Sequence, residues 1–535
     1  MIALRRLLRS AAMLLAVFAV SAAPLSGAQA QSAADGALAL QVLREEIAIG
    51  ETLARLGAAP APEVVVVRNV RVVDPADASV RDRQSIVVSL GAIFWVGDTN
   101  AEPEIGDALV IDGRGLYAAP GLTDMHVHSA SASSWLLNLA NGVTTLREMD
   151  GFPWMLAARE AAREGRLLAP TSYVAGTIIN YLPFENFFVT ARDAITARRI
   201  VRQQAACGYD FVKVHNVLPE RVFDVVAAQA RESGLDLVGH VPHRMRVRHA
   251  VEQGMRTMEH LKGFIDDRTL TLGDTDYDAA VGPNVWVTPT FYAYRRSVEE
   301  ERAAYDAVGA YVPARVRAEW RALAATPDDE VTRLNRNVQV LGAQIVRELA
   351  ARRVHFLAGT DAANYPFQAM GFALVEEMRL LTRAGLAPAD AVRAATTAPA
   401  QAMRAERDFG RIAPGMRADI VLLARNPLEN AGAYAQNQGV MVRGRWLERA
   451  ALDGALAELT QLYADGRTQP RLTRAGAEAL AGSAEALVAN GFVFNPRILV
   501  DADAALRRAG YAPAAARLAA LAIAPTTGPC AAPVP

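Results

Sequence analysis

The stretch Gly121-Leu122-Thr123-Asp124-Met125-His126-Val127-His128 combines a short apolar run with two histidines in alternate positions. Alternate side chains of a strand share one face, so His126 and His128 are predicted to point the same way. Seven more short apolar runs follow, each succeeded by a helical stretch or an insertion: Thr144–Met149, Ser172–Ala175, Phe211–His215, Leu235–His240, Thr257–His260, Val285–Pro289 and Val354–Thr360. Buried strands separated by helices form a parallel sheet, and eight such units predict an α/β fold with a (β/α)8 TIM barrel over residues 117–405.

Strand patterns also flank this barrel on both sides. They occur in residues 63–116, at Val64–Val67, Val70–Val73, Ser85–Leu90, Ile93–Val96 and Ala108–Ile111, and in residues 406–449, at Asp419–Leu423 and Gly439–Arg443. We expect the two flanks to form one small, discontinuous β-sandwich domain. Residues 31–62 are predicted to be an N-terminal helix with a linker, and residues 450–535 a helical C-terminal extension.

The first thirty residues have the pattern of a signal peptide. Arg5, Arg6 and Arg9 precede the apolar run Ala11–Ala23, and Ala28-Gln29-Ala30 is a small-residue cleavage site. We therefore expect cleavage after Ala30 and export across the inner membrane, to the periplasm. No later run reaches the roughly 18 apolar residues of a membrane span, so none is predicted in the mature chain.

The composition excludes some partners and leaves other questions open. The formal net charge is −1, without a basic run, so no nucleic-acid partner is expected. A homo-oligomer remains open. An oxidising compartment allows a disulfide between Cys207 and Cys530, but they lie far apart in the sequence, which does not favour the pair.

Only two of the 56 cationic residues are lysines, Lys213 and Lys262. Lys213 lies inside the apolar run Phe211–His215, and a buried lysine needs a partner or a lowered pKa. A neutral lysine amine reacts with carbon dioxide to form a carbamate that can bridge two cations, which arginine cannot do because it stays protonated. A lysine paired with a carboxylate in the barrel core is the alternative.

Other metal-type side chains stand at the ends of predicted barrel strands. His240 and His260 each end an apolar run, and Asp361 follows the eighth run. Functional groups of TIM barrels gather at these carboxyl ends of the strands. Together with His126, His128 and Lys213, these residues predict a centre for two divalent cations. Asp124 is expected to orient one of the imidazoles from behind.

At these residues the chain resembles the amidohydrolase superfamily, in its imidazolonepropionase-like and Xaa-Pro or Xaa-Arg dipeptidase-like branch, over about Val64 to Arg449. The resemblance rests on Ala119–His128, Gly142–Thr145, Lys213, Gly239–Pro242, Glu259–Leu261, Gly359–Ala362 and Gly410–Val421. It implies that His126 and His128 hold one cation with Asp361, that N6-carboxylated Lys213 bridges, and that His240 and His260 hold the second.

The expected function is cleavage of an amide bond in a small molecule, a peptide or an N-acyl amino acid, as by a dipeptidase. The nucleophile would be a bridging hydroxide activated by two cations, expected to be Zn²⁺, with Asp361 moving the proton. Alternatives are a cyclic amide, lactone or phosphoester hydrolase with the same centre, and a non-catalytic binding protein on this fold. The candidate substrate-binding residues are His215, Tyr292, Tyr294 and Arg147.

Overall fold

A computed structural model describes residues 28–58, 62–129, 131–182, 188–266, 271–294, 308–324, 330–362, 368–464, 472–523 and 530. The predicted signal peptide lies outside the described residues except for Ala28–Ala30, which begin the first described helix. Among the helices in these ranges, none is both long and apolar enough to cross a bilayer.

The eight predicted barrel strands are all present and parallel. They are β6 (Leu122–Val127), β7 (Val143–Glu148), β8 (Thr171–Val174), β11 (Phe211–Val214), β12 (Asp236–Gly239), β13 (Met255–Glu259), β16 (Trp286–Thr288) and β17 (His355–Phe356). Gly176 N donates to Phe211 O at 3.0 Å beyond β8, and Met125 N donates to Ala358 O at 2.9 Å between β6 and the end of β17. These two junctions close the barrel, which confirms the predicted fold class.

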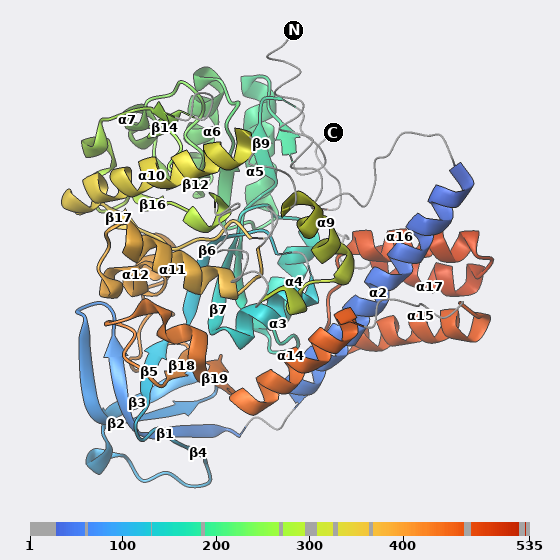
Figure 1. Ribbon diagram of the computed structural model, residues 1–535, viewed down its shortest axis with the longest axis horizontal. Coiled ribbons are helices and arrows are strands. Elements are labelled where there is room, and N and C mark those ends of the chain that lie inside the picture. The colour runs from blue at the N-terminus through green and yellow to red at the C-terminus, as the bar shows by residue number, and fades with distance from the viewer. Residues whose placement is uncertain are drawn as a thin grey trace.

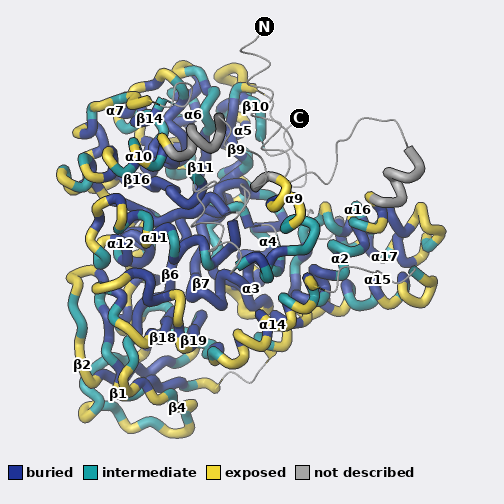
Figure 2. Tube along the Cα trace, viewed as in Figure 1, coloured by how far each residue is buried: buried dark blue, intermediate teal, exposed yellow. Residues whose placement is uncertain are grey.

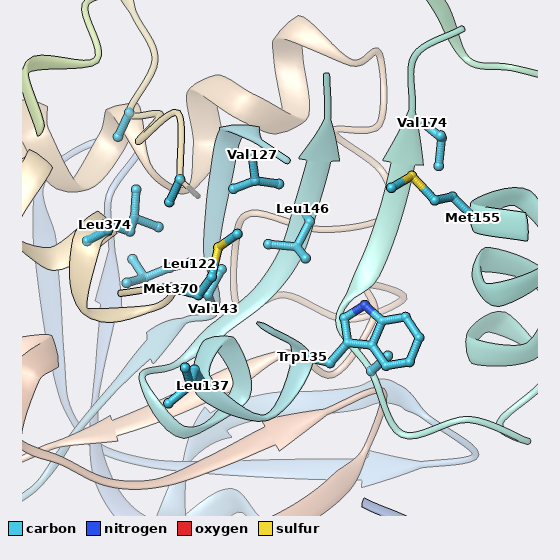
Figure 3. Packing of buried hydrophobic residues seen from close by; sticks show 14 of the residues in the cluster. Leu122, Val127, Trp135, Leu137, Val143, Leu146, Met155, Val174, Met370 and Leu374 are labelled. Atoms are coloured by element: carbon cyan, nitrogen blue, oxygen red, sulfur yellow. The ribbon is translucent and has the colours of Figure 1, made fainter. Parts of the chain in front are cut away.

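Helices surround the barrel strands and cover their outer faces (Figure 1). They are α3 (Ala132–Ala140), α4 (Pro153–Arg163), α5 (Ala194–Ala206), α6 (Glu220–Glu232), α7 (Val247–Glu252), α10 (Glu330–Ala351), α11 (Phe372–Ala384), α12 (Pro388–Ala394) and α13 (Thr397–Ala402). Leu122, Val143, Leu146 and Val174 point from the strands toward Trp135, Met155 and Leu374 of these helices (Figure 3). This apolar layer holds the strands rigidly, which fixes the positions of the side chains at their carboxyl ends.

Several short elements lie in the connections. Two unpredicted strands, β9 (Ile178–Asn180) and β10 (Phe188–Thr190), lie between β8 and β11 in the chain. In the sheet, β9 pairs with β11, and β10 pairs with β9. The others are β14 (Ile265–Asp266), β15 (Thr271–Leu272), α9 (Ala314–Ala324), and the 3₁₀ turns η1 (Thr99–Ala101), η2 (Tyr277–Ala280), η3 (Phe291–Tyr294), η4 (Gly309–Tyr311) and η5 (Ala431–Gln436).

The two flanks of the barrel form one β-domain, as the sequence predicts, but its strands belong to a single eight-stranded sheet and not to the two sheets of a sandwich. Its strands are β1 (Val64–Asp74), β2 (Ser79–Ser89), β3 (Ala92–Asp98), β4 (Leu109–Asp112), β5 (Tyr117–Pro120), β18 (Ile420–Leu423), β19 (Asn437–Val442) and β20 (Arg445–Glu448). Antiparallel pairing of β18 with β5 joins the later flank to the earlier one, and the sheet encloses its own apolar core. Residues Tyr117–Pro120, which were assigned to the barrel, belong to this sheet instead.

A helical arm projects from the barrel and is built from both ends of the chain (Figure 1). It contains α2 (Ala28–Ala58), α14 (Arg449–Ala464), α15 (Arg474–Ala489), α16 (Pro496–Arg508) and α17 (Ala512–Ile523), and α2 packs against α16, α15 and α14. Buried residues line the junctions between these helices (Figure 2). The predicted N-terminal helix and C-terminal extension are thus parts of one body.

A disulfide bond joins Cys207, at the end of α5, to Cys530. Their Cα atoms lie 5.5 Å apart although 323 positions separate them in the sequence. The prediction that disfavoured this pair was wrong, because sequence separation says nothing about distance once the chain has folded back on the barrel.

Candidate metal centre

Three of the predicted ligands meet at the mouth of the barrel. His126 and His128 come from the end of β6, and Asp361 follows β17. Asp361 Oδ1 lies 3.4 Å from His126 Nε2 and 3.1 Å from His128 Nε2. One donor atom from each of these residues lies within 4.8 Å of the other two, a spacing that suits a single cation.

The other two histidines continue the same cluster. Measured between ring centroids, His260 lies 4.5 Å from His126 and 4.7 Å from His240. His260 Nδ1 is also 3.9 Å from Asp361 Oδ2. The ends of β6, β12, β13 and β17 therefore bring four imidazoles and one carboxylate together.

Lys213 enters this cluster from β11. Its side chain is almost fully buried, and its Nζ atom lies 3.1 Å from His126 Nε2. Burial lowers the pKa of the Lys213 ammonium, against the opposing charges of Asp361 and Glu259. All six residues predicted as metal ligands are thus neighbours in the structure.

The charge states of these groups suit metal binding. Burial lowers the pKa of His126, His240 and His260, and takes that of His128 to about 4, so their imidazoles are neutral near pH 7. Burial opposes ionisation of Asp361, but His260, His126 and His128 outweigh it and hold the pKa of this carboxyl below its usual value. Neutral imidazoles and a carboxylate are the forms that bind divalent cations.

The ring of His128 provides a separate indication of a cation. Its Nε2 atom is buried and makes no aligned hydrogen bond within the described part of the chain. A buried polar atom that lacks a hydrogen bond lowers the stability of the fold. A cation between His128 Nε2 and the Asp361 carboxylate would bind both of these ligand atoms. The residues present therefore fit a bound metal.

The backbone is strained at two of these ligands. His260 has a φ of 61° and Asp361 a φ of 58°, in the left-handed region that non-glycine residues rarely adopt. Such conformations persist where the surrounding structure enforces them, and they concentrate at functional sites. Both side chains are turned into the cluster from the ends of their strands.

In three of the imidazoles, the Nδ1 atom lies within hydrogen-bond distance of a side-chain oxygen of another residue. His126 Nδ1 lies 2.9 Å from Glu259 Oε2, and His260 Nδ1 lies 2.6 Å from Thr290 Oγ1. His240 Nδ1 pairs with Asn216 Oδ1. These contacts leave Nε2 of each ring for a cation. Asn216 and Thr290 were not predicted from the sequence, because no sequence signal marks either one.

Contrary to expectation, the hydrogen bonds of Asp124 to described residues run to backbone amides and a hydroxyl, and not to an imidazole. Its carboxylate accepts hydrogen bonds from Thr360 N at 3.1 Å, Thr360 Oγ1 at 2.7 Å and His126 N at 3.2 Å. It therefore ties the backbone beside His126 to the backbone beside Asp361. Glu148 acts similarly one strand away, since it accepts a hydrogen bond from Ser129 N at 2.9 Å, directly after His128.

Of the four candidate substrate residues, Arg147 lies in the wrong place for that role. It is 2% exposed and donates hydrogen bonds to Met125 O, Thr257 Oγ1 and Glu259 Oε1 inside the barrel. Each of the three guanidinium nitrogens is engaged by a residue of β6 or β13. We therefore withdraw Arg147 as a substrate-binding residue.

His215 stands beside the cluster. Its ring centroid lies 4.4 Å from that of His240 and 4.8 Å from that of Phe188 on β10. The residue is half-buried, and its Nδ1 atom has no hydrogen-bond partner within the described ranges. Tyr292 and Tyr294 follow Thr290 in η3, where Tyr292 N donates to buried Glu377 at 2.7 Å. Their role in substrate binding stays a prediction.

Comparison with known proteins places this geometry in a family. The model of the amidohydrolase family matches residues 117–447. An imidazolonepropionase from Anaeromyxobacter dehalogenans is 30% identical over 383 residues, covering 65% of this chain and 86% of the relative.

Solved structures agree with the fold. A bottromycin amidohydrolase superposes with a TM-score of 0.65 at 26% identity, covering 77% of this chain and 93% of the other. A Xaa-Pro dipeptidase with bound methionine superposes with a TM-score of 0.56 at 19% identity, covering 72% and 100% of the two chains. Because the family model matches more than half of the sequence and includes every barrel strand, this chain belongs to the amidohydrolase family and is a hydrolase of carbon–nitrogen bonds.

Proposed function

We propose that this hydrolase depends on two divalent cations, Zn²⁺ by its donor set, and cleaves the amide bond of a peptide or an N-acyl amino acid. The observation that carries the proposal is the meeting of six predicted ligands from five barrel strands: His126, His128, Lys213, His240, His260 and Asp361. Histidine, lysine and aspartate side chains are seldom buried for structural reasons alone, so structural pairing does not explain why six of them meet at one barrel mouth.

In this proposal His126, His128 and Asp361 would hold one cation and His240 and His260 the other, and N6-carboxylated Lys213 would serve as a ligand to both. Cations bound there would lower the pKa of water and polarise the scissile carbonyl. Asp361 accepts the proton of the attacking water and delivers it to the leaving amine. The oxygens of Glu259, Asn216 and Thr290 hold the imidazoles in place while this occurs.

The substrate class rests on similarity. Two solved structures that share the fold are named as a Xaa-Pro dipeptidase and a prolidase complexed with N-methylphosphonate-L-proline. A cyclic amide is the second candidate, because the 30% identical relative is an imidazolonepropionase, and the ring in its substrate's name is a cyclic amide. Small-molecule amides are therefore the substrates to screen.

We also propose that the chain is exported to the periplasm and cleaved after Ala30. The basic and apolar leader supports this, and so does the Cys207–Cys530 disulfide, because such bonds persist in oxidising compartments. N-terminal sequencing of the protein from a periplasmic extract tests the proposal, with Gln31 as the expected first residue.

The decisive measurement is metal content per chain by elemental mass spectrometry. We expect about two cations in the wild type and one or none in Lys213→Ala, because the variant lacks the bridge. Lys262→Ala is a matched control, since Lys262 is the other lysine of the chain, and it should keep the wild-type content. Carbon-13 NMR after incubation with labelled bicarbonate reports the carbamate itself.

The alternatives give different results in the same experiment. One cation in both wild type and Lys213→Ala would remove the bridge and favour single-metal chemistry. No cation under metal-replete conditions would refute the metal-dependent proposal. With two cations present, turnover of Xaa-Pro dipeptides or N-acyl amino acids supports the first substrate class, and turnover of imidazolonepropionate alone supports the second.

A further inference from the structure

A closed network of buried polar side chains borders the His126 ring. Arg147 on β7 donates from Nε to Met125 O at 2.6 Å, from Nη1 to Thr257 Oγ1 at 3.0 Å, and from Nη2 to Glu259 Oε1 at 2.7 Å. Thr257 Oγ1 donates to the same Glu259 oxygen at 2.6 Å. All three guanidinium nitrogens of Arg147 thus donate hydrogen bonds inside the barrel, and Glu259 Oε1 accepts hydrogen bonds from both Arg147 and Thr257.

The second oxygen of Glu259 faces His126. Glu259 Oε2 lies 2.9 Å from His126 Nδ1, and both side chains are fully buried. A carboxylate that Arg147 keeps ionised only accepts hydrogen bonds, so His126 must carry its proton on Nδ1. Without Arg147 the carboxylate would be a buried, unpaired charge, which is strongly destabilising.

The other edge of the ring faces the cluster. His126 Nε2 lies 3.1 Å from Lys213 Nζ and 3.4 Å from Asp361 Oδ1. With the proton held on Nδ1 by Glu259, the ring presents the lone pair of Nε2 to these groups.

We propose that Glu259, supported by Arg147 and Thr257, is a positioning residue that fixes the tautomer and orientation of His126. The carboxylate fixes the proton on Nδ1 and so directs the lone pair of Nε2 toward the cation. This inference rests on the proposed metal centre for its effect on binding, but not for the tautomer itself. Arg147 acts through Glu259 and does not touch substrate.

The first test is metal affinity, measured by competition with a chromophoric chelator for Zn²⁺. Glu259→Gln should weaken binding about 10- to 100-fold, because an amide neither keeps the charge nor imposes one tautomer. Glu46→Gln is the matched control: Glu46 is also a buried carboxylate, but it accepts from Ala132 N at the junction of α2 and α3. The control should retain wild-type affinity. Equal affinities in wild type and folded Glu259→Gln would overturn the inference.

The second test does not need metal or activity. Nitrogen-15 NMR of histidine-labelled, metal-free wild type should show His126 protonated on Nδ1, with the signal assigned by its loss in His126→Gln. Glu259→Gln should show a mixture of tautomers. A wild-type His126 protonated on Nε2 overturns the inference even if Glu259→Gln does not fold. If the wild type binds no Zn²⁺, the proposed function fails. The NMR measurement of the His126 tautomer in metal-free protein still tests whether Glu259 positions this ring.

Discussion

Asp361 is a residue at which charge and backbone conformation can be tested separately. It has a φ of 58°, which asparagine tolerates and alanine does not. We expect Asp361→Asn to fold like the wild type but to lose roughly 100-fold or more in kcat/KM, because the group that moves the proton is gone. Asp361→Ala should lose the same activity and, in addition, about 1–2 kcal/mol of stability from the strained backbone.

Steady-state kinetics and thermal unfolding of the two variants check this prediction. A fully active Asp361→Asn enzyme would remove Asp361 from proton transfer. Equal melting temperatures for the two variants would show that the left-handed backbone is not costly at this position.

At the residue scale, the sequence predicted which metal-type side chains gather at the barrel mouth, but not the residues that hold them there. His126, His128, His240, His260 and Asp361 were predictable because each stands at or just after a strand end, where a barrel collects its functional groups. Lys213 was predictable because a lysine inside an apolar strand needs a special role. The partners of their rings were not predictable, since Asn216 is 24 positions from His240 and Thr290 is 30 positions from His260. Only the order of strands around the barrel brings such pairs together.

At the scale of elements, Gly359 sets the distance between the eighth strand and the first. A Cβ atom there would lie 2.8 Å from His126 Cβ and 2.6 Å from Thr288 Cγ2. We expect Gly359→Ala to displace His126 and so to lower both the melting temperature and the metal content. Gly106→Ala is the control, because no atom lies within 4 Å of the added Cβ. Wild-type metal content in Gly359→Ala would show that the ligand tolerates the displacement.

The prediction of elements succeeded where a buried pattern is long enough to read. All eight barrel strands and the discontinuous sheet were identified from apolar runs and turns. Strands β9 and β10 were not, because each offers only two consecutive apolar residues, whereas the apolar runs that predicted the similarly short β16 and β17 extend beyond those strands. Tyr117–Pro120 was misassigned because its apolar residues continue directly into β6, and only its pairing with β1 and β18 shows which sheet it joins.

At the scale of the whole molecule, Glu46 links the helical arm to the barrel. It is buried on α2 and accepts a hydrogen bond at 2.8 Å from Ala132 N, the first residue of α3. Burial raises its pKa from 4.5 to about 7. The folded state therefore favours the protonated form, and this contribution to stability is present below pH 4.5 and lost as the pH rises toward 7.

Glu46→Gln removes this pH dependence, because a neutral amide has no charge to bury. We expect the variant to gain stability over the wild type between pH 5 and pH 8, by up to about 3 kcal/mol. Denaturant unfolding at several pH values measures the difference. A difference that stays constant with pH would show that Glu46 ionises in the folded protein as it does in the unfolded chain.

The assembly of the arm from both ends of the chain has a consequence for synthesis. Thr52 on α2 donates to Glu458 on α14, 406 positions later, and α15 and α16 cover α2 from still farther along the chain. As the chain leaves the ribosome, α2 emerges early while these partners are made last. Side chains such as Leu43 and Leu53, which are buried in the folded protein, therefore become fully buried only after the C-terminal helices have been synthesised. A chain that stops short of α15 leaves part of the apolar surface of α2 uncovered, and chaperones and proteases bind such surfaces.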